Sequence, residues 1–127
     1  MRGRKPTLKA LPGALKAVPS PPKWLPEAAK AEWRRAARDL VDRRVLTDTT
    51  LATLTSYCLA TGIVRSSTEE IEANGATCDG KRHPAFQNLF DAMRQARQLA
   101  AELGLTPTSR SKIPEGADDD DDALVAD

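Results

Sequence analysis

The side chains that most often carry catalytic or metal chemistry are few in this sequence and widely spaced. His83 is the single histidine and stands directly before Pro84. Metal binding or proton transfer at His83 would require partner residues that the surrounding sequence lacks, so we interpret His83 as a neighbour of a helix N-cap. Cys78 lies beside Asp79 in a short loop, but no base that would activate its thiol can be identified.

The sequence also lacks the motifs by which larger catalytic sites are recognised. It contains no glycine-rich phosphate loop, no cysteine and histidine set at metal-binding spacing, and no histidine-paired nucleophile. The carboxylates are dispersed along the chain or gathered near its end, and no spacing brings two of them into one pocket. We therefore predict that the protein is not an enzyme and binds neither a metal ion nor a cofactor.

Charge patterning is the feature that could support binding. The formal net charge of +1 hides a basic segment at residues 1–23, which has no acid, and an aspartate run near the other end. The basic side chains of this segment are Arg2, Arg4, Lys5, Lys9, Lys16 and Lys23. The run that we assign to partner binding is Asp118, Asp119, Asp120, Asp121 and Asp122. The basic segment favours contact with nucleic acid and the acidic run favours a basic partner; two solvated, disordered ends are the alternative.

Two more basic groups lie within the part of the chain that should fold. Lys30, Arg34 and Arg38 are spaced by four residues and form a stripe along a predicted helix. Like charges at this spacing repel by a few tenths of a kcal/mol, so helix stability does not explain them. A phosphate-facing surface, pairing with acids of a neighbouring subunit, and a plain solvated face remain open. Lys81 and Arg82 form the second cluster, and we include all five residues among the candidate DNA-binding residues.

Composition divides the 127 residues into three parts. Six prolines crowd the first 26 residues, so we expect residues 1–23 to form a flexible basic arm and residues 115–127 to form a disordered acidic tail. Residues 24–114 are predicted to form a helical oligomerisation core. A core of this size is modest for a monomer, and self-association would add buried apolar surface.

Apolar periodicity predicts three main helices, so the expected fold class is all-α. The first helix is expected at residues 26–44, with Trp24 as a hydrophobic staple on its first turn. The second is expected at residues 48–73, where Gly62 costs about 1 kcal/mol in a helix interior and indicates a kink or a close helix crossing. The third begins at Pro84 and ends at Leu103-Gly104, the residue pair of a left-handed helix cap.

The faces of these helices follow from the spacing of their apolar side chains. Those of the first helix are Ala29, Trp33, Ala36, Ala37, Leu40 and Val41. The third helix carries Ala85, Leu89, Met93, Ala96, Ala100 and Leu103, with Phe86 and Phe90 beside them. The width of this last face predicts neighbours on more than one side. Between the second and third helices, Asp79-Gly80 predicts a small hairpin or ordered loop.

Cysteine usage and hydropathy indicate an intracellular, soluble protein. Two cysteines do not make a disulfide framework, and Cys58 falls in an apolar helical pattern typical of a small core residue. No apolar run approaches the roughly 18 residues of a membrane span. The basic N-terminal segment is not followed by the apolar stretch of a secretory signal.

The order of several short motifs resembles a known family. A Lys/Pro-rich segment precedes P-x-W-L at residues 22–25, and Glu32-Trp33 then lies within the first helix. Leu46-Thr47-Asp48 and Tyr57-Cys58 follow, then a basic loop ending at His83-Pro84. The last motif is L-G-L-T-P-T-S-R at residues 103–110. This arrangement resembles the small terminase subunit of tailed bacteriophages, in the branch whose core ends in L-G-L-T-P-x-S-R, over residues 22–110.

The resemblance implies a non-enzymatic partner of the large terminase subunit, which is the ATPase and nuclease of genome packaging. Small subunits of this kind assemble into ring-shaped homo-oligomers, recognise double-stranded viral DNA and modulate the large subunit in the host bacterial cytoplasm. Some members carry a helix-turn-helix domain, for which 23 residues are too few. We therefore expect DNA contact from the arm and from exposed Lys and Arg of the ring.

Two other classes of function remain as alternatives, and one motif has no settled role. A small helical DNA-binding regulator of the repressor or antitoxin type would share the basic surface, as would a pure protein-interaction adaptor whose arm only aids solubility. The segment after Gly104 is expected to form a structured turn. Ser109 is a candidate cap in that turn, and Arg110 is a candidate intersubunit or DNA-contacting charge.

Overall fold

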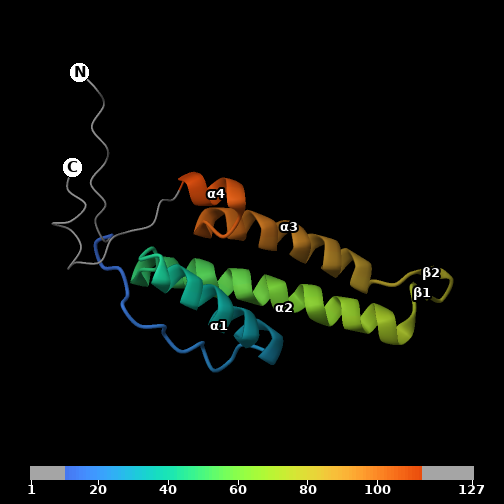
Figure 1. Ribbon diagram of the computed structural model, residues 1–127. Coiled ribbons are helices and arrows are strands. Elements are labelled where there is room, and N and C mark those ends of the chain that lie inside the picture. The colour runs from blue at the N-terminus through green and yellow to red at the C-terminus, as the bar shows by residue number, and fades with distance from the viewer. Residues whose placement is uncertain (1–10, 113–127) are drawn as a thin grey trace, which may run out of the picture.

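The computed structural model describes residues 11–112, which form a helical hairpin with one helix across it. The elements are α1 (Glu27–Asp42), the single 3-10 turn η1 (Asp48–Thr50), α2 (Leu51–Asn74), β1 (Thr77–Cys78), β2 (Lys81–Arg82), α3 (Ala85–Leu103) and α4 (Pro107–Lys112). Figure 1 shows α2 and α3 running side by side, with β1 and β2 at their far tip and α1 against the inner part of α2. The predicted all-α class is confirmed.

Helix α1 buries the face that apolar periodicity predicts. Its buried residues are Ala29, Trp33, Ala36, Ala37, Leu40 and Val41. The helix begins directly after Pro26, whose missing N–H would have no partner in a first turn. It ends before Arg44, which takes a left-handed conformation with φ of 61°.

The predicted staple by Trp24 is wrong. The Trp24 side chain is 65% exposed, whereas Leu25 is buried in the core. Leu25 directly precedes the N-cap residue Pro26, and this is the position from which a side chain turns back onto the first turn of a helix. Trp24 stands one residue too early to do so.

Helices α1 and α2 approach each other closely at Gly62. A Cβ atom built on Gly62 would lie 3.2 Å from the Ala29 Cβ and 3.3 Å from the Ala29 backbone nitrogen. The predicted close crossing is therefore confirmed. Around this crossing, Leu54 and Cys58 of α2 pack fully buried against α1. Ala29 belongs to the first turn of α1, so the crossing lies near the start of that helix. We call residues 63–92, which extend beyond the crossing, the outer hairpin (Figure 1).

The start of α2 is fixed by a reciprocal threonine cap. The Thr47 backbone N–H donates to Thr50 Oγ1 at 3.0 Å, and the two side chains complete a capping box around η1. The second helix thus begins where the sequence predicts, but its first three residues form a 3-10 turn.

The tip of the hairpin is a tight two-residue turn, as Asp79-Gly80 predicts. Thr77 pairs with Arg82 and Cys78 pairs with Lys81 in an antiparallel ladder. Asp79 and Gly80 have φ of 53° and 78°, the left-handed values that a type I′ turn requires at both central residues.

Helix α3 is capped at both ends by residues that the sequence singles out. His83 Nδ1 accepts a hydrogen bond from the Ala85 backbone N–H at 3.0 Å, which confirms His83 as part of the helix cap. At the other end Gly104 has φ of 77°, and the Leu105 N–H donates to the Ala100 carbonyl at 2.8 Å. This is the left-handed cap expected after Leu103.

The segment after Gly104 is a short helix, α4, where the sequence predicts only a turn. The Ser109 backbone N–H donates to Thr106 Oγ1 at 3.1 Å, and the Thr106 N–H donates to Ser109 Oγ at 3.1 Å. Thr106 is therefore the cap, and Ser109 supplies the returning half of the capping box. Arg110 Nη2 lies 3.8 Å from Asp39 Oδ1 of α1, within the same subunit.

A buried arginine connects α1 to the same end of the molecule. Arg43 is 4% exposed, and its Nη1 donates to the Gly104 carbonyl at 2.9 Å and to Asp39 Oδ2 at 3.1 Å. Asp39 thus pairs with both Arg43 and Arg110. Through these contacts the L-G-L-T-P-T-S-R string has a physical role, since it places α4 against the end of α1.

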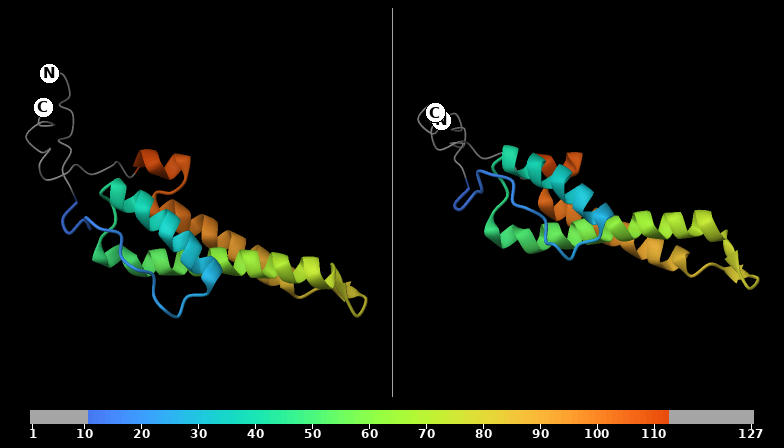
Figure 2. Two further views of the ribbon diagram at one scale, coloured as in Figure 1. Left: turned by 60° about the horizontal axis from the view of Figure 1, so that its bottom comes forward. Right: turned by 90° about the horizontal axis from the view of Figure 1, so that it is seen from below.

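Residues 11–23, the second half of the predicted arm, lie packed along the helices. The Leu15 backbone N–H donates to the Leu46 carbonyl at 2.8 Å, and Trp33 Nε1 donates to the Pro19 carbonyl at 2.9 Å. Leu15 and Val18 pack against the core. Figure 2 shows this segment passing beside α1. These residues are packed rather than free, because their apolar side chains and backbone carbonyls find partners on the helices.

Candidate DNA-contacting surface and hairpin faces

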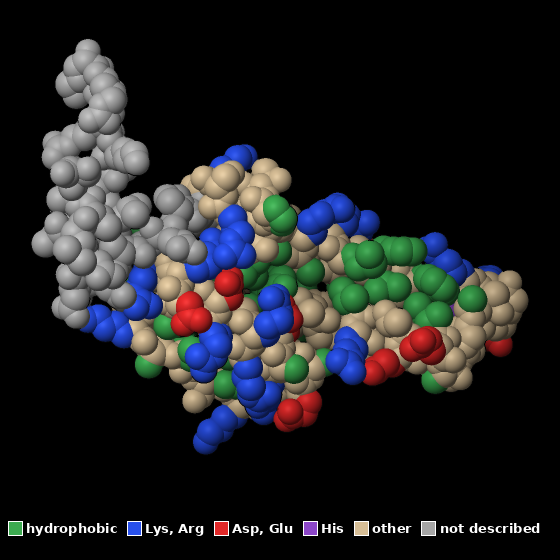
Figure 3. All heavy atoms as spheres, viewed as in Figure 1, with side chains coloured by type: hydrophobic (Ala, Val, Ile, Leu, Met, Phe, Trp, Pro, Cys, Tyr) green, Lys and Arg blue, Asp and Glu red, His purple; other side chains and the backbone are tan. Residues whose placement is uncertain are grey.

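The basic stripe on α1 presents two fully available arginines. Arg34 and Arg38 are exposed and lie one turn apart on the side of α1 away from the core. Lys30, the third member, has a side chain only 21% exposed, and its Nζ lies 3.8 Å from Glu27 Oε1. Figure 3 shows Lys and Arg side chains gathered over the part of the molecule that contains α1. Arg34 and Arg38 are therefore the stripe residues best placed for a phosphate.

Arg35, beside this stripe, has a structural role in the contact between α1 and α2. Its Nε donates to Glu32 Oε1 at 3.0 Å, and the Tyr57 hydroxyl of α2 donates to Glu32 Oε2 at 2.5 Å. Burial raises the pKa of Glu32, but hydrogen bonds from Arg35 and Tyr57 outweigh it, so the pKa lies below its ordinary value. Burial and the Glu32 carboxylate raise the pKa of Tyr57. The cluster holds α1 against α2.

The second basic cluster lies far from the first. Lys81 and Arg82 are exposed at the hairpin tip, at the opposite end of α2–α3 from α4 (Figure 1). The Arg82 guanidinium lies over the Phe86 ring, 5.8 Å from its centroid, and 5.9 Å from that of Phe90. The structure does not bring the two predicted clusters together.

The remaining predicted binding residues divide between the two ends of the chain. Lys16 and Lys23 are exposed in the packed segment that precedes α1. The others lie outside the described residues: Arg2, Arg4, Lys5, Lys9, Asp118, Asp119, Asp120, Asp121 and Asp122.

One side of the α2–α3 hairpin carries exposed apolar side chains edged by arginines. Phe90 is 42% exposed and Met93 is 49% exposed. The hollow at their base has a volume of about 520 Å³ and is lined by Thr61, Val64, Phe90, Met93, Arg94, Ala96 and Arg97. Figure 3 shows hydrophobic side chains gathered over the outer hairpin with basic groups beside them. We call this surface the arginine-rimmed face.

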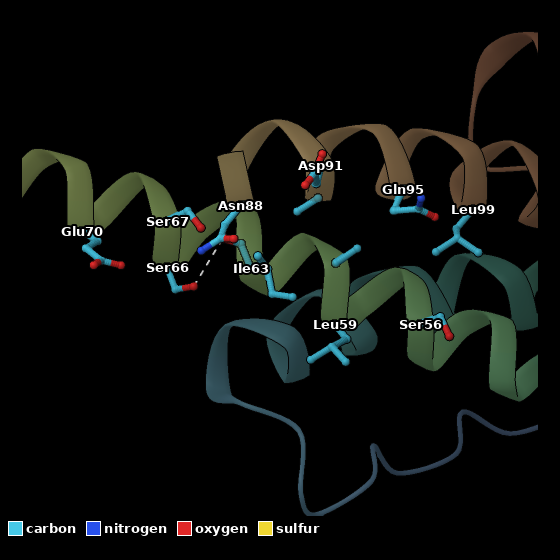
Figure 4. Close-up of a pocket in the computed structure, with 12 residues that line it drawn as sticks. Ser56, Leu59, Ile63, Ser66, Ser67, Glu70, Asn88, Asp91, Gln95 and Leu99 are labelled. Atoms are coloured by element: carbon cyan, nitrogen blue, oxygen red, sulfur yellow. Dashed lines mark hydrogen bonds between the residues drawn. The ribbon is translucent and has the colours of Figure 1, made fainter. Parts of the chain in front are cut away.

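The other side of the hairpin carries a groove of larger volume with acids along it. Its volume is about 640 Å³, and Leu59, Ala60, Ile63, Ala92 and Leu99 supply its apolar lining. Glu70 and Asp91 also line it, and the remaining lining residues are Ser56, Ser66, Ser67, Asn88 and Gln95. Figure 4 shows the α2 and α3 side chains facing this groove from its two walls. We call it the acid-lined groove.

Cys58 is buried in the core, whereas Cys78 is exposed. Burial raises the pKa of Cys58 to about 12, with the Glu32 carboxylate adding to the shift, so its thiol stays protonated. No group of three His, Cys, Asp or Glu side chains between residues 11 and 112 could hold a metal ion. Within the same range, no helix is both long enough and apolar enough to cross a membrane.

The described residues form a short helical hairpin with a crossing helix, a basic stripe and two exposed apolar faces, and so define a small all-helical fold. A family model described as phage terminase, small subunit, matches residues 29–120. The chain therefore belongs to the phage terminase small subunit family, whose role is in phage genome packaging. No curated protein and no solved structure matches the chain.

Two features were not predicted from the sequence: the cluster of Glu32, Arg35 and Tyr57, and the acid-lined groove. Glu32 and Arg35 are three residues apart on a helix, a spacing at which opposite charges pair, so this half of the cluster could have been found. Tyr57 is distant in the sequence and could not. The acid-lined groove was also missed, because its α2 wall mixes Leu59 and Ile63 with serines and shows no continuous apolar stripe.

Proposed function

We propose that this protein is the small terminase subunit that recognises double-stranded viral DNA and regulates the large subunit's ATPase and nuclease during packaging into the procapsid. The family match supports the packaging role. DNA recognition rests on one observation above all, the exposed pair Arg34 and Arg38 on the outer side of α1. The repressor or antitoxin alternative has no comparable support.

The chemistry of the arginine pair suits the DNA backbone. A guanidinium presents a planar fork of donors that matches two phosphate oxygens, and it stays charged at every physiological pH. Contacts of this kind position a protein on the duplex and carry little sequence information. Lys16 and Lys23, which are also exposed, precede α1 in the sequence.

Reading of base edges by a dedicated helix is not part of this proposal. Helix α2, which follows α1, is 24 residues long and buries Leu54, Tyr57 and Cys58. A recognition helix presents its first turns to the major groove, whereas the first turns of α2 pack in the core. We therefore assign the exposed arginines of the α1 stripe to contact with the DNA backbone.

The salt dependence of DNA binding tests this proposal. Each phosphate contact contributes about −0.9 to the slope of log K against log salt concentration. The Arg34→Ala, Arg38→Ala double variant should therefore have a slope shallower by about 1 to 2 than the unaltered protein. Arg65→Ala is the matched control, because Arg65 is exposed on α2 and pairs with Glu69. Equal slopes for all three proteins would refute DNA contact by the α1 stripe.

Assembly into a ring-shaped homo-oligomer completes the proposal. Helix α3 is packed on α2, and α1 lines neither the arginine-rimmed face nor the acid-lined groove. Exposed apolar surface of this kind marks a site of protein association. Association of subunits would also explain the width of the α3 apolar face, which predicts neighbours on more than one side.

Regulation of the large subunit is assigned to the acidic tail. A run of like charges engages an oppositely charged surface through long-range attraction, and Asp118–Asp122 supply five negative charges in succession. Deleting residues 115–127 should reduce stimulation of the large subunit's ATPase and leave the helix content unchanged. The measurement is the ATPase rate of the large subunit against the concentration of the small subunit. A curve that the deletion leaves unaltered would exclude a role of the tail in this stimulation.

A further inference from the structure

The α2–α3 hairpin has two apolar surfaces that point in different directions. The arginine-rimmed face and the acid-lined groove share no lining residue. Successive residues of a helix are turned by about 100°, which places Met93 and Arg97 on one side of α3 and Ala92 and Gln95 on the other. Each copy of the chain therefore carries two separate apolar surfaces.

The charges at the borders of these surfaces have opposite signs. Arg94 and Arg97 line the first surface, and Arg82 lies over the phenylalanine rings beside it. Glu70 and Asp91 line the second. Asp91 and Arg94 form an ion pair one turn apart, so they mark the boundary between the two surfaces on α3. Each carboxylate keeps further acceptor sites, since it has two oxygens.

We propose that the arginine-rimmed face of one subunit docks into the acid-lined groove of the next subunit. In this contact Phe90 and Met93 of one copy enter the apolar lining formed by Leu59 and Ile63 of its neighbour. The arginines along the first edge then meet the acids along the second. This inference rests on the proposed assembly and names the surfaces that form it.

A contact between two different surfaces has a fixed consequence for symmetry. Each copy that joins uses one of its two surfaces and leaves the other unoccupied for the next copy. A head-to-tail contact of this kind therefore either closes into a ring or continues as a filament. Pairing of a surface with itself would instead stop at a dimer. The two faces are oppositely charged at their borders, so each face repels a copy of itself and attracts the other.

Two variants, each damaged on one surface, provide the test. Met93→Asp with Arg97→Glu disrupts the arginine-rimmed face, and Ile63→Lys with Glu70→Lys disrupts the groove. All four side chains are exposed, so circular dichroism should show unchanged helix content. Each variant alone should have the monomer mass. A one-to-one mixture should form a heterodimer, because one intact face meets one intact groove and assembly then stops.

The outcomes of this experiment distinguish an error in the assigned surfaces from a failure of the proposed assembly. If the unaltered protein is a large oligomer and both variants keep that mass, the assignment of surfaces is wrong although the assembly stands. If the unaltered protein is a monomer or dimer, the proposed assembly fails. A mixture that remains monomeric would also overturn the pairing of these two faces.

Crosslinking supplies a measurement that does not depend on disruption. Ile63→Cys and Met93→Cys, combined in a Cys78→Ser background, should give a ladder of subunit multiples with a bismaleimide reagent. Either cysteine alone should give monomers only. Dimers from Met93→Cys alone would show that the arginine-rimmed face pairs with itself, which contradicts the proposal. The absence of any crosslinked species from the double-cysteine protein would contradict it as well.

Discussion

At the scale of single residues, Glu32 shows how one carboxylate organises a helix contact. It accepts hydrogen bonds from Arg35 of its own helix and from Tyr57 of α2, and it is partly shielded from water. Hydrogen bonds to the charged form favour that form. The cluster is therefore a pH-dependent part of the folding free energy.

We predict that the contribution of Glu32 to stability disappears in acid. Its pKa in the folded state lies below the ordinary value, so the stabilisation is present above the unfolded pKa of about 4.3. It is lost as the pH falls through the folded pKa. Glu32→Gln should lower the free energy of unfolding at pH 7, and the difference from the unaltered protein should shrink below about pH 4.

Denaturant unfolding at a series of pH values measures this difference. Glu69→Gln is the control, because Glu69 is exposed and pairs only loosely with Arg65 at 3.4 Å. A difference for Glu32→Gln that stays constant from pH 7 to acid would show that the carboxylate charge has no part in the contact.

At the scale of elements, Gly62 determines how closely α1 can lie on α2. Glycine weakens a helix interior by about 1 kcal/mol, and here its missing side chain admits Ala29 at contact distance. Burial of Trp33, Leu40 and Leu54 between the two helices depends on this approach.

We predict that Gly62→Val destabilises the fold by about 1 to 3 kcal/mol, the usual cost of forcing added atoms into a packed core. The valine methyl groups would meet the Ala29 backbone, which cannot move without displacing α1. Ala52→Val on an exposed position of α2 should change stability by less than about 0.5 kcal/mol. Chemical denaturation of both variants checks this, and equal effects would mean that the crossing is not tight.

Most of the elements follow from local sequence. Apolar spacing alone identifies the buried face of α1, and Asp79-Gly80 and Leu103-Gly104 mark the hairpin turn and the end of α3 because left-handed conformations favour those residues. Helix α4 cannot be predicted from local sequence, because a helix of six residues has little stability of its own. Its partners are Asp39 and the Thr106 cap, and the first of these lies on a distant part of the chain.

The candidate surfaces are predictable only in part. The stripe of Arg34 and Arg38 follows from spacing, whereas the covering of Lys30 by its neighbours and the engagement of Arg35 by Tyr57 depend on how α1 meets α2. The distance between the α1 stripe and Lys81 at the hairpin tip likewise depends on the length of α2. Tertiary geometry, and not residue type, decides these features.

At the scale of the whole molecule, the structure leaves apolar surface on both sides of the hairpin. The inner part of the molecule is closed by α1, by α4 and by residues 11–23, whereas the outer hairpin has only its own two helices. Burial of Phe90 and Met93, at roughly 25 cal/mol for each Å² removed from water, would favour association. The basic stripe on α1 belongs to the inner part, so the proposed assembly through the hairpin would leave Arg34 and Arg38 available for the proposed DNA contact.

The mass of the full chain in solution tests the central claim most directly. Native mass spectrometry, supported by light scattering across a range of protein concentrations, would report the number of copies in the particle. A packaging subunit of the proposed kind should give a single closed oligomer of more than two copies, with no larger species as concentration rises. A monomer, or a dimer that grows no further, would contradict the account.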